Sequence, residues 1–371
     1  MRDSRHEPSW TELLRPVRRR EACKSYQFSA TREARHADAM RLGEKGLALL
    51  KAGGTLPQDQ ALVLVTGHLR AFGDSRFQNQ VQQSWANVGF RSPLVALHTW
   101  DTAGSRESWW ANFRIPQQAV GTSIDFAVRK STLASSLLVH EVEHQPAARI
   151  QTPSPLLVAR SCSSAEELHG LNSMLDSLNA QWYTLWRARW LLEQLWPGRV
   201  PPQMVVLKTR PDAQLRSRAG NLMRRAEKMM LNGSRHVWTC KGWHELGVSD
   251  IAFVTSYAAL SALVRAYERC YAPLLESGAV PCKLLNKPEL VLRLFLEALN
   301  FAIHDGAFDV RWCRNVHQCE QASEHIFNHS ELVHVHDSAR AAIRKCVRSS
   351  GRDGRAFSSP LPRLRHPRFA E

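Results

Sequence analysis

The stretch Gln203–Asp212, QMVVLKTRPD, decides how we interpret this sequence. Its apolar run MVVL is short and rich in β-branched residues, which is typical of a buried strand. The run leads into a charged turn that contains Lys208, Arg210 and Asp212. Pro211 lacks a backbone donor and favours an extended Arg210, so we expect the strand to end there. We therefore predict an acid and two cations at the carboxyl end of a strand, where open α/β sheets bind ligands. Taken alone, the stretch also fits a solvated loop.

Two further strands and a helix are predicted before this stretch. Ala61–Val65 (ALVLV) and Pro93–His98 (PLVALH) are apolar runs of the kind found in buried parallel strands. Between them, Phe77–Val88 carries apolar residues at helical spacing. A strand, a helix and a strand in close succession form a βαβ unit, which predicts a parallel sheet.

Polar residues follow both of these predicted strands. Thr66, Gly67 and Arg70 come after the first strand, and His98 and Asp101 come at the end of the second. A glycine directly after a strand allows the backbone to approach a ligand closely. An arginine can bind a phosphate group through two parallel hydrogen bonds. We expect these groups to meet at one edge of the sheet.

The following segments continue the α/β pattern. Leu171–Leu195 is predicted to be a long helix, and its tryptophans at i, i+4 and i+8 are interpreted as core packing. Asp250 precedes a short strand, and a helix follows at Tyr257–Tyr271. Glu289 lies in the first turn of a helix predicted over Pro288–Ile303. The fold class that we predict is α/β, with a mostly parallel sheet flanked by helices.

The residues HEVEH, at His140–His144, have the spacing of the zinc-protease motif HExxH. Pro146 follows almost at once and would break the helix that such a motif requires. We interpret this segment as a polar strand or loop.

The formal net charge of +15 favours polyanionic or phosphorylated partners. The eight cysteines are scattered, and we interpret them as reduced, mostly buried thiols. No run approaches the ~20 apolar residues that span a bilayer. The N-terminus lacks the apolar core of a secretory signal. We expect no membrane span and, by default, a cytoplasmic location.

Composition divides the chain into three parts. Residues 1–57 are predicted to be a basic N-terminal extension and residues 58–336 an α/β domain. Residues 337–371 are rich in Arg, Ser and Pro and are predicted to be a disordered cationic tail.

The motifs in their order resemble a known family. They are TGHLRAF, HTWD, QWYTLWRARWLLEQL, KTRPD, SDIAFVTSYAAL and PELVLRLFLEAL, within Ala61–Ile303. This set resembles a loosely characterised group of glycosyltransferase-like proteins from algae, bacteria and large viruses. Those proteins have the Rossmann-like, A-type nucleotide-diphospho-sugar transferase fold (GT-A). The resemblance implies transfer of a sugar from a nucleotide-diphosphate donor to a glycan, lipid or protein acceptor, with or without Mn²⁺ or Mg²⁺.

The resemblance also implies roles for individual residues. Those expected to bind the donor are Thr66, Gly67, Arg70, His98, Asp101, Lys208 and Arg210. Asp212 is the expected metal ligand, and Asp250 or Glu289 is the expected catalytic base. The sequence departs from the family pattern at Lys208, where an arginine is usual, and at His68, where a glutamine is usual. It also has one carboxylate, Asp212, where A-type enzymes usually have two.

Two alternatives remain open. A basic nucleic-acid-binding protein would explain the charge of +15 and the Arg-rich ends, although no reader motif is present. A catalytically degenerate transferase fold, kept as a scaffold, would explain the single carboxylate. Binding of a nucleoside diphosphate distinguishes the enzyme from both.

Overall fold

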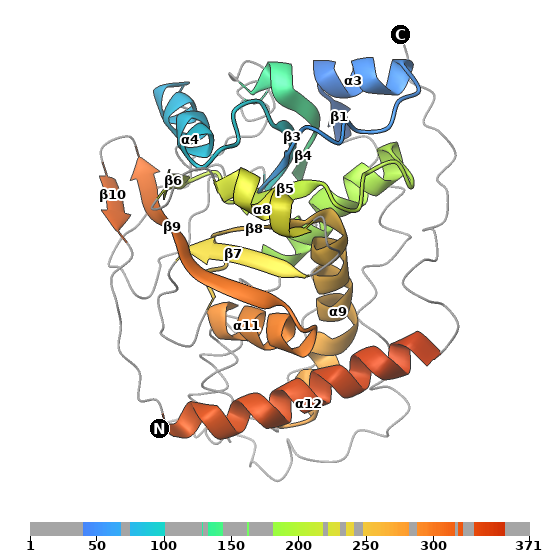
Figure 1. Cartoon of the computed structure of the whole chain (residues 1–371), viewed down its shortest axis with the longest axis vertical. Coiled ribbons are helices and arrows are strands. Elements are labelled where there is room, and N and C mark those ends of the chain that lie inside the picture. Colours follow the sequence, from blue (N-terminus) through green and yellow to red (C-terminus); the bar gives the residue numbers. More distant parts are fainter. Residues whose placement is uncertain are drawn as a thin grey trace, which may run out of the picture.

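Ten strands form one mixed sheet in the computed structural model of the chain (Figure 1). The structure describes residues 40–67, 75–100, 128, 133–143, 162, 181–217, 222–230, 235–240, 248–281, 288–315, 318–321 and 330–352. The strands are β1 (Met40–Leu42), β2 (Leu62–Thr66), β3 (Leu94–Trp100), β4 (Leu137–Glu143), β5 (Val205–Thr209), β6 (Ala213–Ser217), β7 (His236–Cys240), β8 (Ala252–Ser256), β9 (Ala302–Asn315) and β10 (Gln318–Gln321). The helices are α3 (Glu44–Lys51), α4 (Ser75–Asn87), α8 (Leu222–Met230), α9 (Tyr257–Glu276), α11 (Pro288–Ala298), α12 (Ser330–Arg352) and a helix over 181–195.

Four parallel strands, in the order β4-β3-β2-β5, form the first half of the sheet. The chain runs from β2 outward to β3 and β4, and then returns to the other side of β2 as β5. The residue pairs Thr66–His98 and Val65–Thr209 therefore lie side by side at the strand ends. In open α/β sheets, ligands commonly bind at the carboxyl ends of strands where the direction changes in this way, here β2 and β5.

The second half of the sheet contains reversed strands. β8 is antiparallel to both β5 and β7, whereas β7 and β9 are parallel. β6 and β10 are antiparallel to β9, and β1 is antiparallel to β4. The predicted α/β class is confirmed, but the sheet is mixed rather than mostly parallel. Apolar runs identify buried strands without showing their direction, and short connections such as that between β9 and β10 favour antiparallel pairs.

Helices cover both faces of the sheet. The larger core contains residues of the helix 181–195, α9, α11 and α12, and the smaller core contains residues of α4 and α8. Trp182, Trp186 and Trp190 are buried in the larger core, so their interpretation as core residues is confirmed. Ser256 caps α9 by accepting a hydrogen bond from the backbone N–H of Ala259.

Residues 40–57 belong to the folded domain, which corrects the predicted boundary at residue 57. β1 is the outer strand of the sheet, next to β4. α3 packs so closely on the start of β4 that a Cβ at Gly46 would lie 2.0 Å from the carbonyl oxygen of Leu138. Only a glycine permits this approach.

Residues 337–352 are also folded, which corrects the prediction of a disordered tail. They form the C-terminal part of α12, which lies across the ends of α9 and α11 at the bottom of the molecule (Figure 1). Ala339 and Ile343 of α12 are buried in the larger core. Their helical spacing gives α12 an apolar face that the high Arg and Ser content of the segment obscures.

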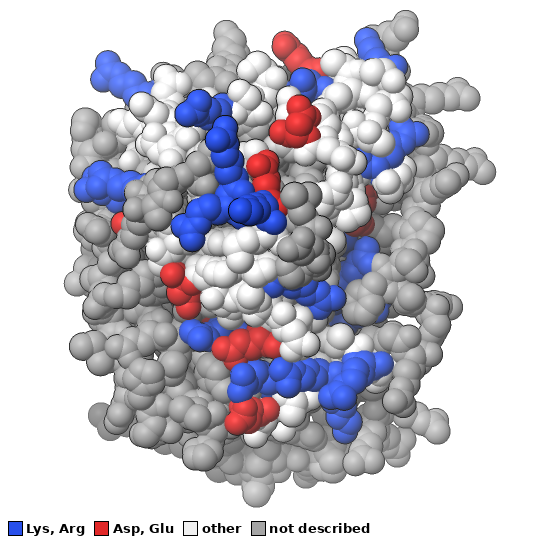
Figure 2. Space-filling view, in the orientation of Figure 1, with Lys and Arg blue, Asp and Glu red and all other residues white. Residues whose placement is uncertain are grey.

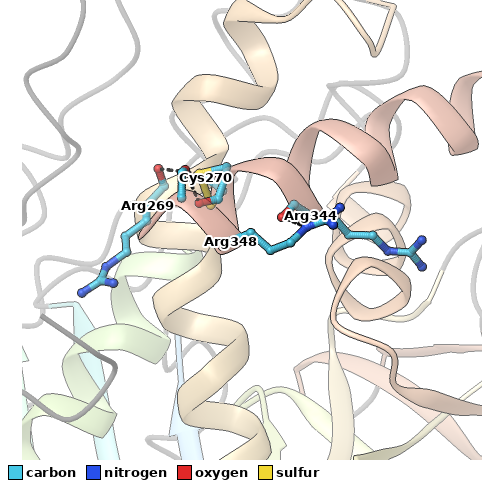
Figure 3. Close-up of a disulfide and its surroundings, with 6 residues drawn as sticks. Arg269, Cys270, Arg344 and Arg348 are labelled. Atoms are coloured by element: carbon cyan, nitrogen blue, oxygen red, sulfur yellow. Dashed lines mark hydrogen bonds between the residues drawn. A yellow bond between two sulfur atoms is a disulfide. The ribbon is translucent and has the colours of Figure 1, made fainter. Parts of the chain in front are cut away.

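A disulfide between Cys270 and Cys346 links α9 to α12 (Figure 3). Cys162 is disulfide-bonded as well. The prediction of reduced thiols is therefore wrong for these three residues, although Cys240 is a free, buried cysteine. None of the helices within the described part of the chain is long and apolar enough to cross a membrane.

The disulfide should stabilise the fold because it joins residues 76 positions apart. We expect the double variant C270A/C346A to lose about 2–4 kcal/mol in free energy of unfolding, measured by urea denaturation. Reductant should destabilise the wild type more than the double variant. If reductant lowered the free energy of unfolding equally in the wild type and the double variant, the disulfide would not stabilise the fold.

Candidate functional site

Gly67 directly follows β2, beside the carboxyl end of β5. Its φ is +117°, a backbone conformation that residues other than glycine rarely adopt. Its N–H donates a hydrogen bond to the carbonyl oxygen of His98 at 3.2 Å. A Cβ at this position would point at Pro211 and lie 3.9 Å from its Cδ. Gly67 therefore lies next to the turn after β5, and its positive φ favours glycine there.

Arg210 and Asp212 lie in the turn after β5 and form an ion pair. Arg210 donates from Nε to Oδ1 of Asp212 at 2.9 Å and from Nη2 to Oδ2 at 2.8 Å, which is the paired geometry of a guanidinium on a carboxylate. Asp212 is 1% exposed and Arg210 is 20% exposed. Burial acts to lower the pKa of Arg210, but the carboxylates of Asp212, Asp250 and Glu289 together outweigh this effect and raise it, with Asp212 contributing most of the three. Arg210 is thus a fixed, charged donor with one edge toward solvent.

Lys208 holds the loop before β8 next to this pair. Its Nζ donates to the carbonyl oxygen of Asp250 and, at 3.4 Å, to that of Ile251. Burial lowers the pKa of Lys208 to about 8, and the Asp250 carboxylate opposes this shift. Glu289 also acts on the site, since its charge contributes to the raised pKa of Arg210.

The structure thus gathers five of the predicted site residues at one end of the sheet: Lys208, Arg210, Asp212, Asp250 and Glu289. Thr66 is buried at the end of β2, directly before Gly67. Arg70 and Asp101 lie outside the described residues. We name the space between Gly67 and Arg210–Asp212 the strand-end crevice.

A metal ion fits poorly at Asp212. It belongs to no group of three potential metal ligands within the described part of the chain. Its two carboxylate oxygens accept hydrogen bonds from Arg210. The role of Asp212 that follows directly from the geometry is to orient Arg210.

A second polar cluster lies on the inner side of the neighbouring strands. His98 of β3 is paired in register with Glu141 of β4, and Glu143 lies two residues further on the same face. His98 Nε2 is 3.1 Å from Oε2 of Glu143 and 3.6 Å from Oε2 of Glu141. All three residues are buried. The structure therefore places the His98 side chain in this cluster with Glu141 and Glu143.

The helix 181–195 contributes the partners of both carboxylates. Arg187 donates to the two oxygens of Glu141, from Nε at 2.7 Å and from Nη2 at 2.8 Å. The Tyr183 hydroxyl lies 2.9 and 2.8 Å from the two oxygens of Glu143. Burial and the neighbouring Glu143 raise the pKa of Tyr183, so its hydroxyl stays protonated and acts as a donor.

We name His98, Glu141 and Glu143 the buried triad, and these residues could hold a metal ion. Sequence reasoning missed Glu141 and Glu143 as a cluster with His98. The interpretation of HEVEH as a polar strand is confirmed by β4, which ends at Glu143. A usable signal was present, because acids at i and i+2 of a strand point to the same face.

Comparison with protein-family models, with curated proteins and with solved structures finds no match to this chain.

The lowered pKa of Lys208 predicts a pH dependence of stability. The unfolded chain holds this proton up to about pH 10.5, whereas the folded protein loses it near pH 8. The unfolded state therefore binds more protons between these values, so stability should rise with pH. We expect the free energy of unfolding to increase by about 2–3 kcal/mol more in the wild type than in Lys208→Met across this window.

Lys51→Met, at an exposed lysine in the last turn of α3, is the matched control and should keep the wild-type slope. Parallel curves for the wild type and Lys208→Met would contradict the lowered pKa.

Proposed function

We propose that the chain transfers a sugar from a nucleotide-diphosphate donor to a hydroxyl acceptor, with the donor diphosphate in the strand-end crevice. One observation carries the proposal: at the carboxyl ends of β2 and β5, a glycine with positive φ lies next to the turn that holds an arginine oriented by a buried acid. Oriented guanidinium groups are suited to binding diphosphates. The parallel strands followed by the reversed strand β8 are compatible with the A-type transferase fold that the sequence resembles.

The reaction breaks the bond between the sugar and the diphosphate and forms a bond from the sugar to the acceptor oxygen. Arg210 stabilises the negative charge that develops on the leaving diphosphate, and it is preorganised for this because Asp212 holds it in place. Lys208 adds a second positive charge below its pKa of about 8. Asp250 or Glu289 takes the proton that the acceptor hydroxyl loses.

Nucleoside diphosphates provide the first test, by calorimetry with UDP and GDP, and with CMP for comparison. We expect one of the diphosphates to bind selectively and Arg210→Gln to weaken its binding about 10- to 100-fold, since a charge-assisted pair of hydrogen bonds is lost.

Arg216→Gln is the matched control, because Arg216 is exposed on the nearby β6 and the charge change is the same. Its affinity should equal that of the wild type. Equal weakening in both variants would point to general charge rather than to the crevice, and the absence of any nucleotide binding would contradict the proposal.

Asp212→Ala tests the catalytic arrangement. It should abolish consumption of a verified sugar donor, because Arg210 loses its orienting partner, while circular dichroism shows the fold unchanged. Donor turnover at the wild-type rate would contradict the role of Asp212.

Nucleic-acid binding is a second candidate function, favoured by basic side chains on α12. Arg344, Lys345 and Arg348 are all exposed on this helix, and Figure 2 shows basic side chains in a row along the lower part of the molecule. Because α12 is part of the fold, charge reversal rather than deletion is the suitable test. If R344E/R348E abolished a steeply salt-dependent binding to DNA, this second function would gain support.

A further inference from the structure

We propose that the buried triad, His98, Glu141 and Glu143, binds one divalent transition-metal ion, such as Zn²⁺ or Mn²⁺, in a closed structural site. The proposal is independent of the glycosyl-transfer proposal, since it concerns a different set of side chains.

The spacing of the triad matches that of metal ligands. Its three ligand atoms, one from each residue, all lie within 4.8 Å of one another. Two ligands about 2.1 Å from one ion, at tetrahedral or octahedral angles, are about 3.0–3.4 Å apart. The Nε2 atom of His98 lies 3.1 Å from Glu143 Oε2 and 3.6 Å from Glu141 Oε2. The first of these distances is already that of two ligands on one ion, and the second is only slightly longer.

The two residues of the helix 181–195 are placed as outer-shell partners. Arg187 fixes the plane of Glu141, and the Tyr183 hydroxyl fixes Glu143. A carboxylate has about four lone-pair positions, so each retains acceptor capacity on the side of His98. Hydrogen bonds of this kind orient metal-binding carboxylates in known sites.

The cluster is rich in negatively charged groups. Two buried carboxylates, those of Glu141 and Glu143, lie beside one buried guanidinium, that of Arg187. Carboxylates at such positions are suited to binding a cation.

The donor set selects the kind of ion. One imidazole nitrogen and two carboxylate oxygens suit Zn²⁺, Mn²⁺ or Fe²⁺ better than Ca²⁺ or Mg²⁺, which prefer oxygen ligands alone. The rings of Trp100 and Tyr183 flank His98 edge-on, at centroid distances of 5.3 and 5.8 Å. The triad is thus enclosed, as in structural metal sites, where the ion would fix β3 and β4 to each other beneath the helix.

The experiment is elemental analysis of the full chain purified without chelator, followed by titration of chelator-treated protein with Zn²⁺, Mn²⁺ and, as a spectroscopic probe, Co²⁺. We expect about one transition-metal ion per chain, a Co²⁺ absorption band that saturates at one equivalent, and thermal stabilisation by Zn²⁺ or Mn²⁺. Glu143→Gln should weaken metal binding at least 10-fold. Tyr183→Phe removes only the orienting hydroxyl and should weaken it about 10- to 100-fold without removing a ligand.

Glu193→Gln is the matched control on the same helix, because Glu193 pairs with Arg189 away from the triad. It should bind metal as the wild type does. Metal-free protein with no response to any of the three ions would overturn the proposal. If Glu143→Gln and Tyr183→Phe both bound metal as strongly as the wild type, the proposal would be overturned as well, since the ion would then lie elsewhere.

Discussion

The bidentate ion pair between Glu141 and Arg187 joins the sheet to the helix that covers it. Both side chains are almost completely buried, so neither charge could persist without the other. Removing one partner of such a pair costs about 3–5 kcal/mol, because the remaining charge stays inside the protein. Glu143 and Tyr183 repeat the connection two residues further along β4. The carboxyl ends of β3 and β4 are therefore fixed by polar contacts as well as by the tryptophan-rich core.

Arg210 and Asp212 form a second bidentate ion pair, which is less deeply buried. Arg210 is bound by Asp212 in the same two-bonded way, yet 20% of the Arg210 side chain is exposed, against 2% for Arg187. The buried pair can act only within the fold, whereas the partly exposed guanidinium can reach a ligand. This difference in exposure separates the proposed structural site from the proposed donor site, although Gly67 and His98 are joined by a backbone hydrogen bond.

The sequence revealed those elements whose signal is local. The apolar runs of β2, β3 and β5 and the tryptophan stripe of the helix 181–195 were predicted, because burial of a strand or helix requires such patterns. Strand direction was missed, since an apolar run is the same in either sense. The bridge between Cys270 and Cys346 was missed because its partners are 76 residues apart. In the candidate site, KTRPD gave the Arg210–Asp212 pair, whereas the buried triad depends on which strands become neighbours.

A crystal structure of the protein with its tightest-binding nucleoside diphosphate tests the central claim most directly. The account predicts the diphosphate in the strand-end crevice, against Gly67 and hydrogen-bonded to the guanidinium of Arg210, with Asp212 still holding that guanidinium. A nucleotide bound at another surface, such as the basic face of α12, with the crevice empty, would contradict the account.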